Sequence, residues 1–295
     1  MLTNDLIRTI RHIEIRTKRL VNDSFAGEYH SVFKGRGMEF EEVRPYQPGD
    51  DIRTIDWNVT ARTGEPYVKR FVEERELTVM LVVDASASEN FGSVQRFKRE
   101  LAAELTAVLS FAATTNNDRV GLLIFTDQVE LYIPPRKGRK HVLRLLRELL
   151  AFEPRHSGTD IKLALDTVNH VMKRRGIVFL VSDFMANPEG YRTAMAVTNR
   201  RHDLIAVDLH DPLESSLGNV GLLVMEDPET GEVVWVDTAS KAWRVAFQQR
   251  MEAVRAGTTR AFRHAGVDRI EIATDQDYVA PLAAFFQERY RRIRH

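Results

Sequence analysis

Apolar runs and helix-periodic segments alternate along most of this chain. From residue 77 onward, short apolar runs predict strands, and segments with apolar side chains every three or four positions predict helices. This alternation predicts an α/β fold in which helices cover both faces of a mainly parallel sheet. Only Asp127 and Gln128 separate the second strand from the third, so we expect these two strands to pair antiparallel. The predicted strands are 77–84, 119–126, 129–133, 177–183, 203–209 and 268–273, and the predicted helices lie near 94–115, 139–151, 160–174, 188–200, 240–265 and 279–292.

The N-terminal part follows a different pattern. Residues 4–21 place apolar side chains at helical spacing among arginines and lysines, which predicts a helix with a solvated basic face; a face for nucleic acid or membrane is the alternative. Residues 39–76 have little helical periodicity and several prolines and glycines, which predicts extended strands joined by turns, with Trp57 as a packing anchor. We therefore divide the chain into a helix and β-rich segment at 1–76 and an α/β domain at 77–295.

A hairpin is predicted near the C-terminal side of the domain. Residues 220–237 contain two apolar runs around Glu229-Thr230-Gly231-Glu232, and that tetrapeptide is typical of a hairpin turn. The segment is an insertion before the last helices and strand. Met225, Val234 and Trp235 either form a docking surface there or pack against the long helix that follows.

Oxygen-bearing side chains follow the first predicted strand. Asp84, Ser86 and Ser88 alternate with two small alanines, and alternate positions of an extended backbone face the same side. A hard cation such as Mg²⁺ prefers oxygen ligands and keeps several waters. A polar loop that merely caps the next helix is the alternative. Two later segments add Thr159, at the start of a helix, and Asp183, at the end of a second buried strand.

These motifs together resemble a known family. The D-x-S-x-S run with Thr159 and Asp183 is similar to the metal-ion-dependent adhesion site (MIDAS) of the von Willebrand factor A domain. The stretch GRGMEFEEVRPYQPGDDIRTIDWNVTAR at 35–62 resembles the signature of the "domain of unknown function 58" family (DUF58), whose members place it just before such a domain. The resemblance implies the sheet order 3-2-1-4-5-6 for the six predicted strands. In that order Asp84 and Asp183 lie on adjoining strand ends.

The resemblance also implies how the site works. Ser86, Ser88 and Thr159 would contact the ion directly or through water, while Asp84 and Asp183 would supply charge. The ion would be Mg²⁺, with Mn²⁺ or Ca²⁺ as alternatives, and its last ligand would be a carboxylate from a client protein. Members of the family are further expected to act with MoxR-type AAA+ ATPases, in a chaperone-like role.

Composition narrows the choice of partner and compartment. The 42 basic and 42 acidic residues give a formal net charge of zero, so no overall field attracts nucleic acid or anionic lipid. The absence of cysteine excludes disulfides and iron–sulfur clusters and fits a reducing compartment, so we expect a cytoplasmic protein. No apolar run reaches the roughly 18 residues of a membrane helix, so no direct membrane span is expected.

The leading hypothesis is a non-enzymatic, metal-dependent protein-interaction module. A magnesium-dependent phosphoryl-transfer enzyme or hydrolase that uses Asp84 is the alternative. Against it, Ser86 stands where an aspartate-based phosphatase would carry a second acid, and neither Ser86 nor Ser88 lies in a G-x-S-x-G elbow. The chain also lacks a G-x-x-x-x-G-K-[ST] phosphate loop, so any ATP hydrolysis would belong to the partner.

Overall fold

The computed structural model describes residues 4–20, 29, 32, 38–73, 76–92, 96–226 and 231–294. In chain order its elements are α1 (Asn4–Leu20), β1 (Met38–Pro45), η2 (Ile52–Thr54), α3 (Trp57–Thr63), β2 (Tyr67–Glu73), β3 (Thr78–Asp84), η3 (Ala87–Asn90), α4 (Lys98–Thr115), β4 (Arg119–Phe125), β5 (Val129–Arg136), α5 (Arg139–Leu150), α6 (Ile161–Val171), β6 (Ile177–Ser182), α7 (Pro188–Arg201), β7 (Asp203–His210), α8 (Pro212–Ser215), β8 (Leu222–Glu226), β9 (Val233–Asp237), α9 (Lys241–Ala265), β10 (Asp268–Ala273) and α10 (Val279–Arg294).

The chain forms two compact units, one of Met1–Val32 with Thr78–His295 and the other of Phe33–Leu77. This division differs from the predicted boundary at residue 76, because α1 groups with the sheet rather than with the β-rich segment. Helix α1 packs against α4 and α5. One ion pair supports that packing, since Arg139 donates to Glu14 at 2.6 Å.

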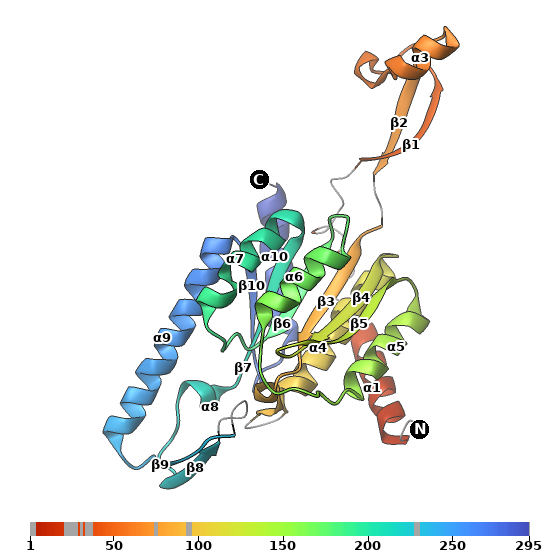
Figure 1. The fold of residues 1–295 in the computed structure, drawn as a ribbon. Coiled ribbons are helices and arrows are strands. Elements are labelled where there is room, and N and C mark those ends of the chain that lie inside the picture. Colours follow the sequence, from red (N-terminus) through yellow and green to blue (C-terminus); the bar gives the residue numbers. More distant parts are fainter. Residues whose placement is uncertain are drawn as a thin grey trace. The chain divides into compact units, whose positions relative to one another are not determined.

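A six-stranded sheet of order β10-β7-β6-β3-β4-β5 is the centre of the larger unit (Figure 1). Neighbouring strands are parallel except β4 and β5, which pair antiparallel as predicted. This is the predicted order 3-2-1-4-5-6. Strand β3 lies between β4 and β6 and is buried from Val79 to Val83, which explains its continuous apolar run. In the β3–β6 register Val83 lies opposite Val181, so these two strands end at the same edge of the sheet.

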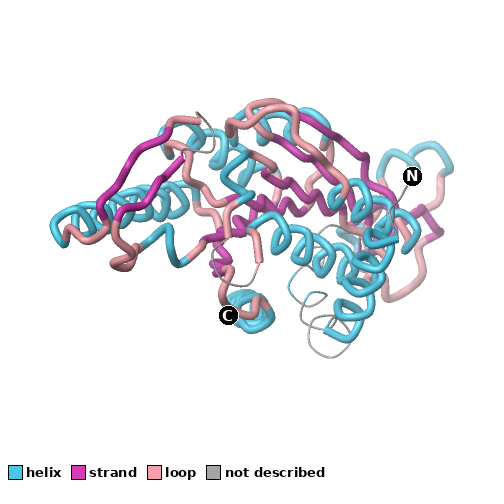
Figure 2. The backbone as a smooth tube through the Cα atoms, turned by 90° about the horizontal axis from the view of Figure 1, so that it is seen from below, coloured by secondary structure: helices cyan, strands magenta, loops and turns pink. Residues whose placement is uncertain are grey.

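Helices cover the sheet on both sides (Figure 2). Helices α6, α7 and α9 pack over one face, where their apolar side chains form a single core cluster with alternate residues of β3, β4, β6 and β7. Helix α4 packs against β3 and β4 and is itself contacted by α1 and α5. None of the helices in the described ranges has the length and apolar content that crossing a bilayer requires.

Leu180→Ala tests the contribution of this core. Leu180 is fully buried in the cluster beneath α6, α7 and α9. Removing its side chain leaves a cavity, so we expect the free energy of unfolding to fall by about 2–5 kcal/mol in urea titrations. The control Val224→Ala, on an exposed face of β8, should change it by no more than about 0.5 kcal/mol. Equal losses in the two variants would contradict this assignment of the core.

The smaller unit corrects the prediction of strands and turns alone. Strands β1 and β2 pair antiparallel, but the seven-residue helix α3 and the short η2 lie between them. The side chain of Asp56 accepts hydrogen bonds from the amides of Asn58 and Val59 and so caps the start of α3. Gly64 ends the helix with a positive φ of 78°. Trp57, predicted as a packing anchor, is 67% exposed.

The predicted hairpin is present as β8 and β9. The two strands pair antiparallel, with Val224 opposite Trp235, while the central turn residues 227–230 lie outside the described part of the chain. One face of the pair is exposed and apolar, and it carries Leu222, Val224, Val233 and Trp235. Trp235 is 68% exposed, so its side chain is not packed against the long helix α9.

Candidate metal centre

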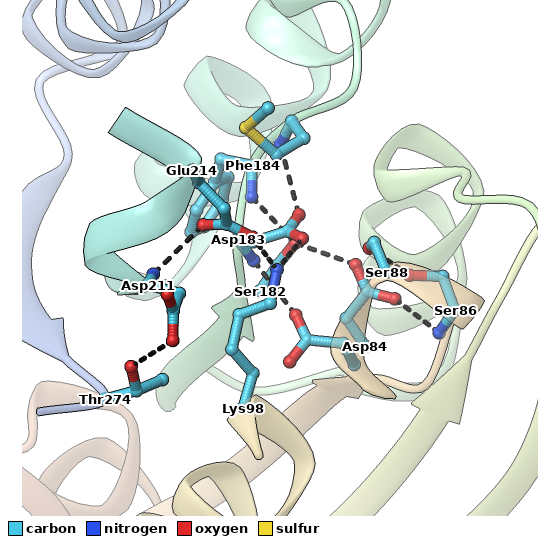
Figure 3. A network of polar contacts seen from close by, with 12 residues as sticks. Asp84, Ser86, Ser88, Lys98, Ser182, Asp183, Phe184, Asp211, Glu214 and Thr274 are labelled. Atoms are coloured by element: carbon cyan, nitrogen blue, oxygen red, sulfur yellow. Dashed lines mark hydrogen bonds and ion pairs between the residues drawn. The ribbon is translucent and has the colours of Figure 1, made fainter. Parts of the chain in front are cut away.

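Asp84 lies at the carboxyl end of β3, beside the end of β6. Its side chain is 3% exposed. One carboxylate oxygen accepts a hydrogen bond from the Ser86 amide at 2.9 Å, and the other accepts one from the Ser182 hydroxyl at 2.7 Å (Figure 3). The sequence interpretation did not single out Ser182, although this serine is the last residue of β6 and directly precedes Asp183. Its hydroxyl group joins the two strand ends.

The chain turns sharply after Asp84 and brings Ser86 and Ser88 together. Their hydroxyl oxygens lie 3.1 Å apart, and Ser86 is fully buried. The Ala87 amide between them donates to the carbonyl oxygen of Ser157. This bond brings the loop that carries the half-buried Thr159 to the same edge of the sheet. All five predicted ligands therefore belong to segments that meet at this edge.

Asp183 follows β6 and is buried among polar groups. One carboxylate oxygen accepts a hydrogen bond from the Met185 amide at 3.1 Å, and the other accepts one from the ammonium of Lys98 at 2.6 Å. Lys98 is the first residue of α4 and its side chain is fully buried. A lysine at a helix start is ordinarily solvated, so no feature of the sequence indicated this ion pair.

Phe184 fixes the direction in which Asp183 points. Its φ of 52° is in the left-handed region, which is unfavourable for a bulky residue. The ring is buried and packs edge-on against Phe262 at a centroid distance of 4.9 Å, with Tyr191 at 6.2 Å. Its amide donates to the hydroxyl of Ser182. The aromatic core thus stabilises a backbone turn that otherwise costs energy.

Glu89 is a third acid in the site, and the sequence interpretation missed it. It is 1% exposed, and one of its carboxylate oxygens accepts a hydrogen bond from the Asp183 amide at 3.1 Å. The other oxygen is buried without a hydrogen-bond partner among the described residues. Oxygens of Asp84, Glu89 and Asp183 lie within 4.8 Å of one another. The only signal in the sequence is its place directly after the D-x-S-x-S run.

Close burial of these acids changes their protonation. Burial, and then the negative charge of Asp183, raises the pKa of Asp84 to about 7. The same two causes raise the pKa of Glu89 well above its ordinary value. Burial lowers the pKa of Lys98, but its carboxylate neighbours, Asp183 foremost, raise it by more. The cluster therefore has more buried acidic groups than one lysine can pair, and burial favours their protonated forms when no cation is bound.

A divalent cation fits this set of donors. Three carboxylates and the hydroxyls of Ser86 and Ser88 are all hard oxygen ligands, which Mg²⁺ and Ca²⁺ prefer. A buried carboxylate oxygen without a partner is costly, and a cation would satisfy the one on Glu89. Asp84, Glu89 and Asp183 would hold such an ion with the two serines. Thr159 remains a predicted ligand from the adjacent loop.

Comparisons with known proteins identify the family. A model described as "Protein of unknown function DUF58" matches residues 42–257. The chain belongs to the DUF58 family. It is 34% identical over 288 residues to the uncharacterised protein Rv1480 of Mycobacterium tuberculosis, covering 97% of this chain and 90% of that protein. It is also 28% identical over 107 residues to the uncharacterised protein YeaD of Bacillus subtilis, covering 36% of this chain and 25% of YeaD.

Two solved structures are similar to this DUF58 chain, and the first of them supports its fold. An aerotolerance-related membrane protein from Bacteroides fragilis is similar with a TM-score of 0.50 and 16% identity, covering 73% of this chain and 99% of that chain. The VWA domain of SpRpn10 has a TM-score of 0.35 and 10% identity, covering 70% of this chain and 93% of that chain. The mainly parallel sheet of the DUF58 chain has the order 3-2-1-4-5-6 that the resemblance to the von Willebrand factor A domain predicted.

Proposed function

We propose that this DUF58 protein is a non-enzymatic, metal-dependent protein-interaction module that acts with a MoxR-type AAA+ ATPase on client proteins. One observation carries the proposal. Three carboxylates and two serine hydroxyls converge at the carboxyl edge of the sheet, which is where open α/β sheets bind their ligands. The choice of ATPase rests on the family resemblance alone.

The donor set supports docking through the metal. Mg²⁺ is rarely enclosed by protein ligands alone and keeps several positions for water or for another molecule. A carboxylate from a client protein is a hard oxygen ligand of the same kind. Binding would then require both the ion and an acidic residue on the client.

The environment of Asp84 speaks against nucleophilic catalysis. A nucleophile needs access to its substrate. Asp84 is almost completely buried, and both of its oxygens accept hydrogen bonds, from Ser86 and Ser182. These contacts suit a residue that orients and neutralises an ion.

The double variant Ser86→Ala/Ser88→Ala tests the proposal. It removes two neutral oxygen ligands and leaves every charge in place, so we expect Mn²⁺ affinity, measured by electron paramagnetic resonance of the free ion, to fall about tenfold or more. Capture of the ATPase or of an acidic client should require Mg²⁺ and should be lost both in chelator and in the variant. Thr63→Ala, an exposed hydroxyl on α3, is the control.

Two results would contradict the proposal. Capture that is equal with Mg²⁺ and with chelator would exclude a metal-dependent contact. Hydrolysis of a generic phosphate ester that disappears in Asp84→Ala would instead favour the enzyme.

A further inference from the structure

Lys98 joins the candidate metal centre to a second segment of the chain. Its ammonium lies 2.6 Å from a carboxylate oxygen of Asp183 and also 2.6 Å from one of Glu214 (Figure 3). Glu214 belongs to α8, the short helix between β7 and the β8–β9 hairpin. One fully buried positive charge thus bridges the end of β6 and the chain after β7.

Glu214 is at the same time part of the cap of α8. Its second carboxylate oxygen accepts a hydrogen bond from the Asp211 amide at 3.0 Å. Asp211 in turn accepts hydrogen bonds from the amide of Leu213 and from the hydroxyl of Thr274 on the chain after β10. A shift of the Lys98 ammonium would therefore change the contacts that fix the position of α8.

We propose that Lys98 is an internal counter-ion of the metal centre. Lys98 competes with the divalent cation for Asp183, and through its contact with Glu214 it transmits the binding of that cation to α8. This inference rests on the proposed metal site. Beside three buried carboxylates and the partly buried Glu214, the ammonium neutralises part of the cluster when no divalent ion is bound. A divalent ion beside Asp183 repels the ammonium, which then bonds Glu214 as its remaining partner.

The physical basis is the strength of charge interactions in a buried site. Even at the effective dielectric of about 20 that suits protein sites, a divalent and a monovalent cation a few ångströms apart repel each other strongly enough to change metal affinity about tenfold or more. Removing the ammonium removes that repulsion and frees an oxygen of Asp183 for the ion. Lysine at this position therefore lowers the metal affinity. Glu214 draws the lysine away from Asp183 and so raises the metal affinity.

The test measures Mn²⁺ binding and amide hydrogen exchange on the full chain. Lys98→Met should bind Mn²⁺ about tenfold or more tightly than wild type. Glu214→Gln should bind it severalfold more weakly, although Glu214 is not one of the proposed ligands. In wild type, Mn²⁺ should slow exchange in residues 211–216, and Glu214→Gln should abolish that change. Glu189→Gln, an exposed acid on α7, is the matched control and should behave as wild type in both measurements.

The outcomes separate this inference from the proposed function. Two results would overturn the role of Lys98 and leave the metal site intact. In the first, wild type binds Mn²⁺ and a folded Lys98→Met protein binds it no more tightly. In the second, wild type binds Mn²⁺ but amide exchange in residues 211–216 does not change. No Mn²⁺ binding by wild type and by Lys98→Met would overturn both. If Lys98→Met does not fold, the exchange of wild type against Glu214→Gln decides.

Discussion

Metal-free Asp84→Asn protein will be more stable than wild type at pH 8, although it will have lost most of its metal affinity. The carboxylate of Asp84 is buried beside that of Asp183, and its pKa of about 7 lies some three units above the roughly 3.9 of an unperturbed aspartate. Asparagine removes the buried charge but keeps its shape: its amide oxygen can accept from the Ser86 amide, and its amide nitrogen can donate to the Ser182 hydroxyl.

The sign of the pH effect follows from the direction of the pKa shift. The raised pKa means that the folded protein binds a proton on Asp84 that the unfolded chain has already released between about pH 4 and pH 7. Wild-type stability therefore falls as the pH rises through this range. The asparagine variant lacks this titration, so it should gain roughly 1–3 kcal/mol over wild type at pH 8 and little at pH 4.

Urea unfolding in chelator at several pH values measures the stability, and Mn²⁺ titration measures the affinity. We expect the affinity to fall by about 100-fold or more, because a neutral amide replaces a charged ligand or its orienting group. Asp166→Asn, on an exposed ion pair of α6, is the control and should change neither quantity appreciably. A variant that loses stability at every pH would contradict the view of Asp84 as a costly, functional charge.

Phe184→Ala will lose both stability and metal affinity. The buried ring contacts Phe262 and Tyr191, so its removal should lower the free energy of unfolding by about 3–5 kcal/mol. The same ring stabilises the left-handed turn that follows Asp183. Without it the carboxylate should lose its fixed direction, and Mn²⁺ affinity should fall about tenfold or more.

Phe286→Ala on α10 is the matched control for this effect. Phe286 is equally buried and packs edge-on against Tyr29 and Phe285, outside the core cluster that contains Phe184. It should lose a similar amount of stability in urea titrations while the folded protein keeps its Mn²⁺ affinity. An equal loss of affinity in both variants would mean that general loosening, rather than the turn at Phe184, is responsible.

Burial on both faces made the central strands predictable. A strand such as β3 has no polar face, so its apolar run and its end at Asp84 are visible in the sequence. The helix α3 was missed because seven residues span only two turns, too few for a periodic pattern. Its N-cap Asp56 and its C-terminal Gly64 were the signs of it in the sequence.

The acids and serines of the site that the sequence predicted stand at or just after the ends of buried strands, where apolar runs stop. The rest depends on tertiary contacts between residues that are usually solvated. Lys98 and Glu214 are 116 positions apart in the sequence. Glu89 is an acid in the first turn of a helix, which is an ordinary place for an acid. Only the folded arrangement shows that these charges are buried together, because burial of a lysine or glutamate depends on the partners that the fold supplies.

The exposed face of the hairpin has a practical consequence for any capture experiment. Within the described residues β8 and β9 form a sheet of two strands, so each has an unpaired backbone edge beside the apolar side chains of Val224 and Trp235. Such edges adhere to unrelated chains by strand addition, and chelator does not remove them. Background adsorption will therefore be insensitive to Mg²⁺. A Val224→Lys variant used as bait should adsorb fewer unrelated proteins, so that metal-dependent capture is easier to detect.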